Sequence, residues 1–103
     1  MTQTTSIELN NVPNQEFTVT FDNVNYIFTF RFIGLFMVYD LSINNVVHVT
    51  GRRIFPYTRL ILNANTVPEV AGNFILNTAN DDYPIYTRFG VDQFLYYIDE
   101  STQ

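Results

Sequence analysis

The sequence predicts an all-β protein: a small antiparallel sandwich or barrel of about six to seven short strands, with at most one short helical turn. Two observations predict this fold class. Apolar residues recur at every second position through most of the chain. Turns rich in asparagine, aspartate and glycine separate these runs at spacings of about ten residues. No long helical pattern competes with this interpretation.

The first predicted hairpin spans residues 17–33. Its two strands are joined by Asp22–Asn25, whose side chains hydrogen-bond their own backbone and tolerate positive φ angles. In the second strand the residues that face the other way, from Ile27 to Ile33, are also partly apolar, which favours a central position in the sheet. The alternating stripe consists of Phe17, Val19, Phe21, Tyr26, Phe28, Phe30 and Phe32.

The next predicted strand, Leu35–Ile43, follows Gly34 and is apolar on both faces. Asn44 and Asn45 then form a polar break suited to a tight hairpin turn, because adjacent asparagines can adopt positive φ angles. A fourth strand is predicted over Val46–Thr50, with Gly51 at its end.

The second half of the chain is less regular. Residues 57–62 are compatible with one helical turn capped by Thr58 or with a further short strand, and the periodicity does not decide between them. A loop is predicted over 63–71 and a turn-rich connection over 79–84. The last predicted strands are Asn73–Thr78 and Phe94–Ile98.

The 103 residues predict one β domain, because no stretch is polar enough for long enough to act as a linker. The two ends, residues 1–6 and 100–103, are expected to fray.

Composition excludes several classes of protein. Without cysteine the chain has no disulfide framework and no thiolate metal site. No apolar run is long enough to span a bilayer, so we expect no membrane insertion. The net charge is −5 and all five basic residues are arginine, which makes nucleic acid an improbable partner. Arginine in place of lysine is typical of positive groups held in planar, partly buried geometry.

No residue pattern predicts catalysis. His48 is the only histidine, so it has no second imidazole with which to build a metal site. No serine lies in a glycine-flanked turn of the kind that exposes a nucleophile. Asp81 and Asp82 precede Tyr83 and Pro84 and lack the further oxygen ligands of a calcium loop. We therefore expect no enzyme, no metal and no cofactor.

The candidate functional residues are instead those of an interface: Arg52, Arg53, Phe55 and Tyr57. Arg52 and Arg53 are the only adjacent basic pair in an acidic chain. They are interpreted either as a solvated strand end or as a patch that binds a carboxylate-bearing partner. The apolar character of both faces of Leu35–Ile43 and Phe94–Ile98 favours stable association with other subunits.

A set of segments follows one another in a distinctive order along the chain: Pro13–Phe17, Tyr26–Phe30, Phe36–Leu41, Gly51, Leu60–Leu62, Gly72–Ile75, Arg88–Gly90, Leu95 and Tyr97. Their order over Ile7–Ile98 resembles the baseplate plug proteins of contractile-tailed phages, as found in cyanophages. The chain differs from the usual pattern at Phe36, where tryptophan is frequent, and at Gly51–Arg53, where an apolar continuation is common.

The resemblance implies a non-enzymatic virion component of the tail baseplate, assembled in the host cytoplasm. It would lie at the junction of tail tube, hub and spike, contact those proteins, and form a symmetric homo-oligomer in the assembly. The alternative is a stand-alone domain that binds a sugar or a small apolar molecule. That alternative requires Tyr83, Tyr86 and Tyr97 to converge on one cleft.

Overall fold

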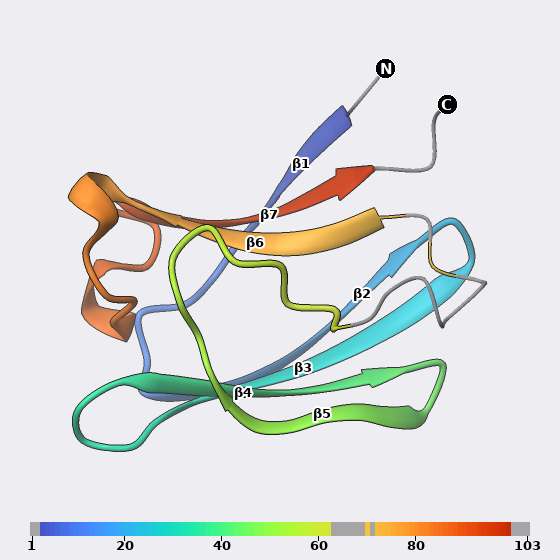
Figure 1. Ribbon diagram of the computed structural model, residues 1–103, viewed down its shortest axis with the longest axis horizontal. Coiled ribbons are helices and arrows are strands. Elements are labelled where there is room, and N and C mark those ends of the chain that lie inside the picture. Colours follow the sequence, from blue (N-terminus) through green and yellow to red (C-terminus); the bar gives the residue numbers. More distant parts are fainter. Residues whose placement is uncertain (1–2, 63–69, 71, 100–103) are drawn as a thin grey trace.

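The computed structural model describes residues 3–62, 70 and 72–99. It is a sandwich of two antiparallel sheets, with strand orders β1-β7-β6 and β2-β3-β4-β5 (Figure 1). The predicted all-β class is therefore confirmed. Two 3-10 turns, η2 (Ala79–Asp81) and η3 (Tyr86–Arg88), lie between β6 and β7. The strands are β1 (Gln3–Ile7), β2 (Asn14–Phe21), β3 (Val24–Phe32), β4 (Met37–Ile43), β5 (Val46–Arg53), β6 (Gly72–Thr78) and β7 (Gln93–Asp99).

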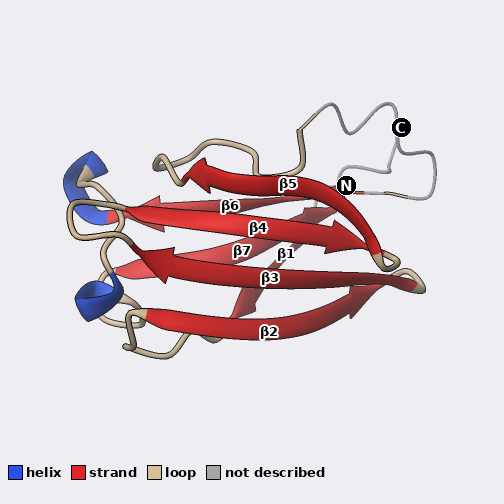
Figure 2. Cartoon of the chain, turned by 90° about the horizontal axis from the view of Figure 1, so that it is seen from below, coloured by secondary structure: helices blue, strands red, loops and turns tan. Residues whose placement is uncertain are grey.

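Two tight turns build the four-stranded sheet as a meander (Figure 2). Asp22 and Asn23 have φ angles of 54° and 65°, and Asn44 and Asn45 have 49° and 68°. Successive positive φ angles define the turn whose twist matches that of the strands it joins. Both hairpin turns predicted from the sequence are confirmed.

The start of β4 differs from the prediction. The expected strand began at Leu35, but that side chain is 86% exposed and β4 begins at Met37. Gly34 has a φ of 98°, and the N–H of Ile33 bonds the carbonyl of Phe36 across the turn at 3.1 Å. Leu35 therefore lies at the tip of a turn, and its place in the alternating pattern does not bury it.

β5 is longer than predicted, because the chain continues through Gly51 to Arg53. Its pairing with β4 shifts register twice, between Tyr39 and Leu41 and again at Ser42. At one shift Asp40 Oδ1 accepts the Gly51 N–H at 2.6 Å and also Arg31 Nη2 at 3.0 Å. Gly51 has the positive φ of 61° that this irregular edge requires.

The amino-terminal prediction was wrong for part of its range. Residues 1–6 were expected to fray, but Gln3–Ile7 forms β1 and pairs with β7 along its whole length. The run is polar, so its order comes from β7, a central strand, and not from a stripe of its own. Residues 1–2 and 100–103, also expected to fray, lie outside the described residues.

The core is dominated by aromatic side chains that meet between the sheets. Phe74 of β6 lies 4.8 Å from the Phe28 ring and 5.0 Å from the Tyr26 ring, both in edge-to-face geometry. The Phe21 and Tyr97 rings stack at 3.9 Å. The alternating stripe predicted for β3 is confirmed as the inner face, since Tyr26, Phe28 and Phe30 are completely buried.

The segment 54–62 leaves the end of β5 and bonds to β6 of the other sheet (Figure 1). It is neither the helical turn nor the strand that the sequence left open. The N–H groups of Tyr57 and Leu60 each donate to β6, to the carbonyls of Leu76 and Phe74 at 2.9 Å. The segment therefore covers the outer edge of β6 without continuing as a regular strand.

Two buried side chains hold this segment in place. Asn73 accepts the Ile61 N–H at 2.8 Å and donates its amide to the Ile61 carbonyl at 3.1 Å. The Tyr39 hydroxyl, on the opposite sheet, donates to the Leu60 carbonyl at 2.8 Å. The backbone of Leu60 and Ile61, the buried part of the segment, is thus paired inside the protein, as buried polar groups require.

We predict that Gly72→Ala lowers the free energy of unfolding by about 1–3 kcal/mol, the usual cost of overpacking. A Cβ at this position would lie 2.2 Å from the Ile98 carbonyl oxygen and 2.7 Å from the Tyr97 ring. Urea denaturation measures the loss. Thr50→Ala, at an exposed site, is the control, and equal stabilities of the two variants would contradict the prediction.

Tyr39 predicts a specific loss of stability at high pH. Burial raises the pKa of its hydroxyl from 10.0 to about 12, and the nearby charge of Arg52 lowers it in part. The unfolded chain ionises first, so this stabilisation is complete below pH 10 and disappears as the pH rises to about 12. Tyr39→Phe should lose less stability than the natural chain over this interval in denaturation experiments. Equal losses in both proteins would contradict this assignment.

Candidate functional site

Arg53 lies at the centre of a cluster of aromatic rings at the end of β5. Its guanidinium carbon is 4.2 Å from the centroid of the Phe36 ring, 4.8 Å from that of Tyr83 and 5.0 Å from that of Phe55. Phe55 and Tyr83 remain 43% and 63% exposed. We call these four residues the arginine–aromatic cluster.

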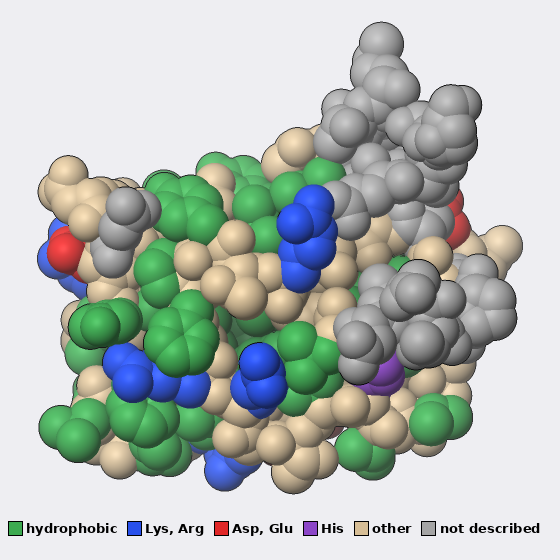
Figure 3. All heavy atoms as spheres, in the orientation of Figure 1, with side chains coloured by type: hydrophobic (Ala, Val, Ile, Leu, Met, Phe, Trp, Pro, Cys, Tyr) green, Lys and Arg blue, Asp and Glu red, His purple; other side chains and the backbone are tan. Residues whose placement is uncertain are grey.

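The register of the sheet explains how the cluster forms. Arg53 is opposite Val38 of β4, and Phe36 lies two residues before Val38, so Phe36 and Arg53 are diagonal neighbours. Phe55 follows β5 directly, and Tyr83 comes from the connection between η2 and η3. Over the end of the molecule where the β3–β4 turn lies, basic side chains are set among apolar ones (Figure 3).

The positive charge of the cluster is not neutralised by the described part of the chain. The ion pairs there join Arg31 to Asp40 at 3.0 Å and Arg88 to Asp92, and neither involves Arg53. The buried Arg53 Nε has no hydrogen-bond partner among the described residues. When a guanidinium packs on aromatic rings, its N–H groups that point outward remain available to bind a carboxylate.

The structure separates the other two predicted interface residues from Arg53. Arg52 is opposite Tyr39 in register and is exposed on the other face of β5, because side chains alternate along a strand. Tyr57 has a φ of 61°, and its hydroxyl donates to the Thr78 carbonyl at 2.6 Å. Of the predicted set, only Arg53 and Phe55 share the cluster.

Sequence reasoning missed Phe36 and Tyr83 as members of the site. Phe36 shares a face of its predicted strand with Val38, and this two-residue spacing is the one signal that could have linked it to a residue of β5. Tyr83 is far from Arg53 in the sequence and reaches it only through the packing of the two sheets. No local pattern indicates that contact.

Of the residues considered for catalysis, His48 bonds to the protein's own backbone and Asp82 faces solvent. His48 Nε2 lies 2.6 Å from the Leu62 carbonyl oxygen, to which it donates a hydrogen bond. Asp82 is exposed beyond η2. Within residues 3–62, 70 and 72–99, no group of three histidine, cysteine, aspartate or glutamate residues is placed to hold a metal ion.

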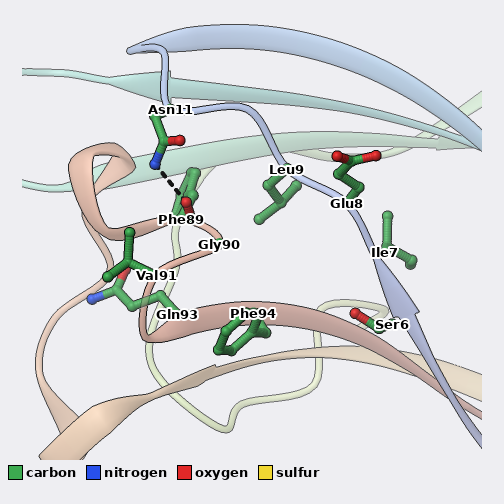
Figure 4. Close-up of a pocket in the computed structure, with 10 residues that line it drawn as sticks. All are labelled: Ser6, Ile7, Glu8, Leu9, Asn11, Phe89, Gly90, Val91, Gln93 and Phe94. Carbon is green, nitrogen blue, oxygen red and sulfur yellow. Dashed lines mark hydrogen bonds between the residues drawn. The ribbon is translucent and has the colours of Figure 1, made fainter.

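A pocket of about 470 Å³ lies beside the end of β1 (Figure 4). Two of its polar side chains hold the protein's own loops. Asn11 donates its amide to the Phe89 carbonyl, and Gln93 accepts the Ile85 N–H and donates to the Tyr83 carbonyl. The lining residues are Ser6, Ile7, Glu8, Leu9, Asn11, Phe89, Gly90, Val91, Gln93 and Phe94.

The three tyrosines that a ligand-binding cleft would need are dispersed. Tyr97 is buried and stacks on Phe21, Tyr86 packs edge-to-face on Phe32, and Tyr83 belongs to the arginine–aromatic cluster. None of the three lines the pocket. The interpretation as a stand-alone sugar or small-molecule binder therefore loses the feature on which it depended.

Comparison with known proteins decides the family. The family model described as the cyanophage baseplate Pam3 plug gp18 matches residues 3–100. The chain belongs to this baseplate plug family. The resemblance found in the order of its segments is thereby confirmed. No curated protein sequence matches the chain.

Membership in the plug family makes the chain a structural component of the phage tail baseplate, associated with other baseplate proteins in the virion. In the described ranges of this plug-family chain, no helix has the length and apolar character needed to cross a membrane.

We predict that Arg53→Gln lowers the free energy of unfolding of this plug-family chain by about 1 kcal/mol, since the three ring contacts lose their cation. Arg52→Gln is the matched control, because the exposed Arg52 contacts none of these rings and an exposed substitution changes stability by less than about 0.5 kcal/mol. Thermal unfolding of the two variants makes the comparison. A larger loss in Arg52→Gln would contradict the role of the rings.

Proposed function

We propose that the chain plugs or adapts the junction of tail tube, hub and spike in a contractile phage tail baseplate. It acts there by shape and contact, without catalysis or a cofactor. Its neighbours are the tube, hub and spike proteins, and its own copies form a symmetric homo-oligomer that assembles in the host cytoplasm. The plug family and the all-β sandwich support this role.

The observation that carries the proposal is the arginine–aromatic cluster. Exposed aromatic rings and arginine are the side chains most enriched at the energetic centres of protein interfaces. In this cluster Phe55 and Tyr83 supply exposed apolar area, and the Arg53 guanidinium is already positioned by the rings. A side chain that is already held in its bound position loses less conformational entropy when the two proteins associate.

The partner surface at this cluster carries a carboxylate. Arg53 has no acidic partner within the described residues. The cluster is therefore a positive region on a chain whose net charge is −5. A carboxylate bound to a guanidinium in a partly dry interface forms a strong, directional pair. Arg52, on the other face of β5, and Tyr57, whose hydroxyl bonds the Thr78 carbonyl, lie outside this docking surface.

The test is co-expression of the full chain with the tube, hub and spike proteins of the same phage, followed by affinity purification. We expect the natural chain to co-purify with at least one of them. Arg53→Gln should lower the recovered complex by about tenfold or more, as loss of a buried charge pair does.

Thr50→Glu is the matched control, because it changes the net charge by the same amount at an exposed site of β5. Its recovery should equal that of the natural chain. Equal recovery with Arg53→Gln would exclude the cluster as the docking surface. Failure of the natural chain to co-purify with any of these proteins would overturn the proposed role itself.

A further inference from the structure

We infer that the free chain forms a symmetric dimer through the edge of β2. The inference concerns an interaction between two copies and does not depend on the baseplate role. It rests on three features of β2. Its outer main-chain groups are unused, its apolar stripe is only half-buried, and its sequence can pair with its own copy without placing like charges opposite each other.

The outer main-chain groups of β2 are free to pair. The Phe32 N–H bonds the Pro13 carbonyl at 2.9 Å, so the odd-numbered residues of β2 are the ones that bond to β3. In an antiparallel pair, every second residue directs both N–H and C=O away from its partner strand. Figure 2 shows β2 on the outer edge of its sheet, with no described strand beyond it. The outward groups belong to Asn14, Glu16, Thr18 and Thr20.

Two of the other sheet edges are less able to pair, and β1, the remaining edge, is only five residues long. β5 shifts register twice against β4, and the segment 54–62 bonds to the outer side of β6. β2 pairs with β3 over eight residues without a shift. A long regular edge of this kind is the part of a sheet that most readily accepts another strand.

The inner stripe of β2 is incompletely covered. Burial alternates along the whole strand, but Phe17, Val19 and Phe21 reach only the half-buried class, whereas Phe28 beside Phe17 is completely buried. A strand added at this edge would continue the stripe and cover these side chains. The Gln15 amide bonds both main-chain groups of Asn10, at 2.8 and 3.1 Å, which ties the preceding loop to the inner side of the sheet.

A second copy of β2 can pair with this edge in an antiparallel register centred on Phe17. With Phe17 on the two-fold axis, the two Phe17 side chains face each other in a pair without hydrogen bonds, and Glu16 faces Thr18 of the other copy in a hydrogen-bonded pair. Glu16 is the only charged residue of the strand, so this register avoids placing two carboxylates opposite each other. Pro13 then faces Phe21 in a pair without hydrogen bonds, so the missing N–H of proline does not weaken the ladder between the two copies.

The absence of cysteine allows a direct test with single-cysteine variants of the full chain. In the inferred register Glu16→Cys and Thr18→Cys lie opposite each other, about 5.5 Å apart at Cα, within reach of a disulfide. Each lies about 8 Å from its own copy, which is too far. We therefore expect cross-linked dimer on mild oxidation of the mixture, and little with either variant alone.

Thr50→Cys, an exposed position on β5, is the control and should not cross-link to Glu16→Cys. Sedimentation equilibrium of the natural chain should give twice the monomer mass of 12.0 kDa. Thr18→Pro removes only an outward N–H and should return the chain to a monomer without unfolding it.

Three results would overturn the inference. One is a natural chain that remains monomeric, and another is cross-linking of Thr18→Cys with itself, which requires a different register. The third is cross-linking at β2 only after a tube, hub or spike protein is added, which would show that the free chain does not form the dimer by itself. None of these results bears on co-purification through the arginine–aromatic cluster, so the two proposals fail separately.

Discussion

The contact of Phe74 with rings of both sheets is the interaction on which the sandwich depends. Its ring lies within 5.0 Å of Tyr26 and Phe28 on one sheet and of Tyr97 on its own. Aromatic pairs of this kind contribute about 0.5–1.5 kcal/mol each beyond the area they bury. Because Phe74 belongs to β6, an edge strand, the position of that strand must be fixed for the core to close.

The connection 54–62 fixes β6, which links the core to the candidate site. Asn73 and Phe74 are adjacent in β6, so the residue that pairs with the backbone of Ile61 directly precedes the central ring. Tyr39 reaches the same connection from the other sheet. The segment begins immediately after Arg53, and the same stretch of chain therefore closes the sandwich and carries Phe55 into the arginine–aromatic cluster.

The parts of the fold that the sequence predicts are those set by local interactions. The turn at Asp22–Asn23 and the stripe through Phe28 depend on residues close together in the chain. β1 was missed because its polar residues gain order only from β7. For the same reason the site was predicted in part: Phe55 is near Arg53 in sequence, whereas Tyr83 meets it only after both sheets have packed.

The arginine–aromatic cluster also joins the two layers of the sandwich at one end of the molecule. Phe36 and Phe55 flank strands of the four-stranded sheet, and Tyr83 belongs to the connection between two strands of the other sheet. A partner bound at the Arg53 guanidinium would therefore meet chain segments that belong to both sheets. The shape of the surface offered to that partner depends on how the two sheets pack on each other.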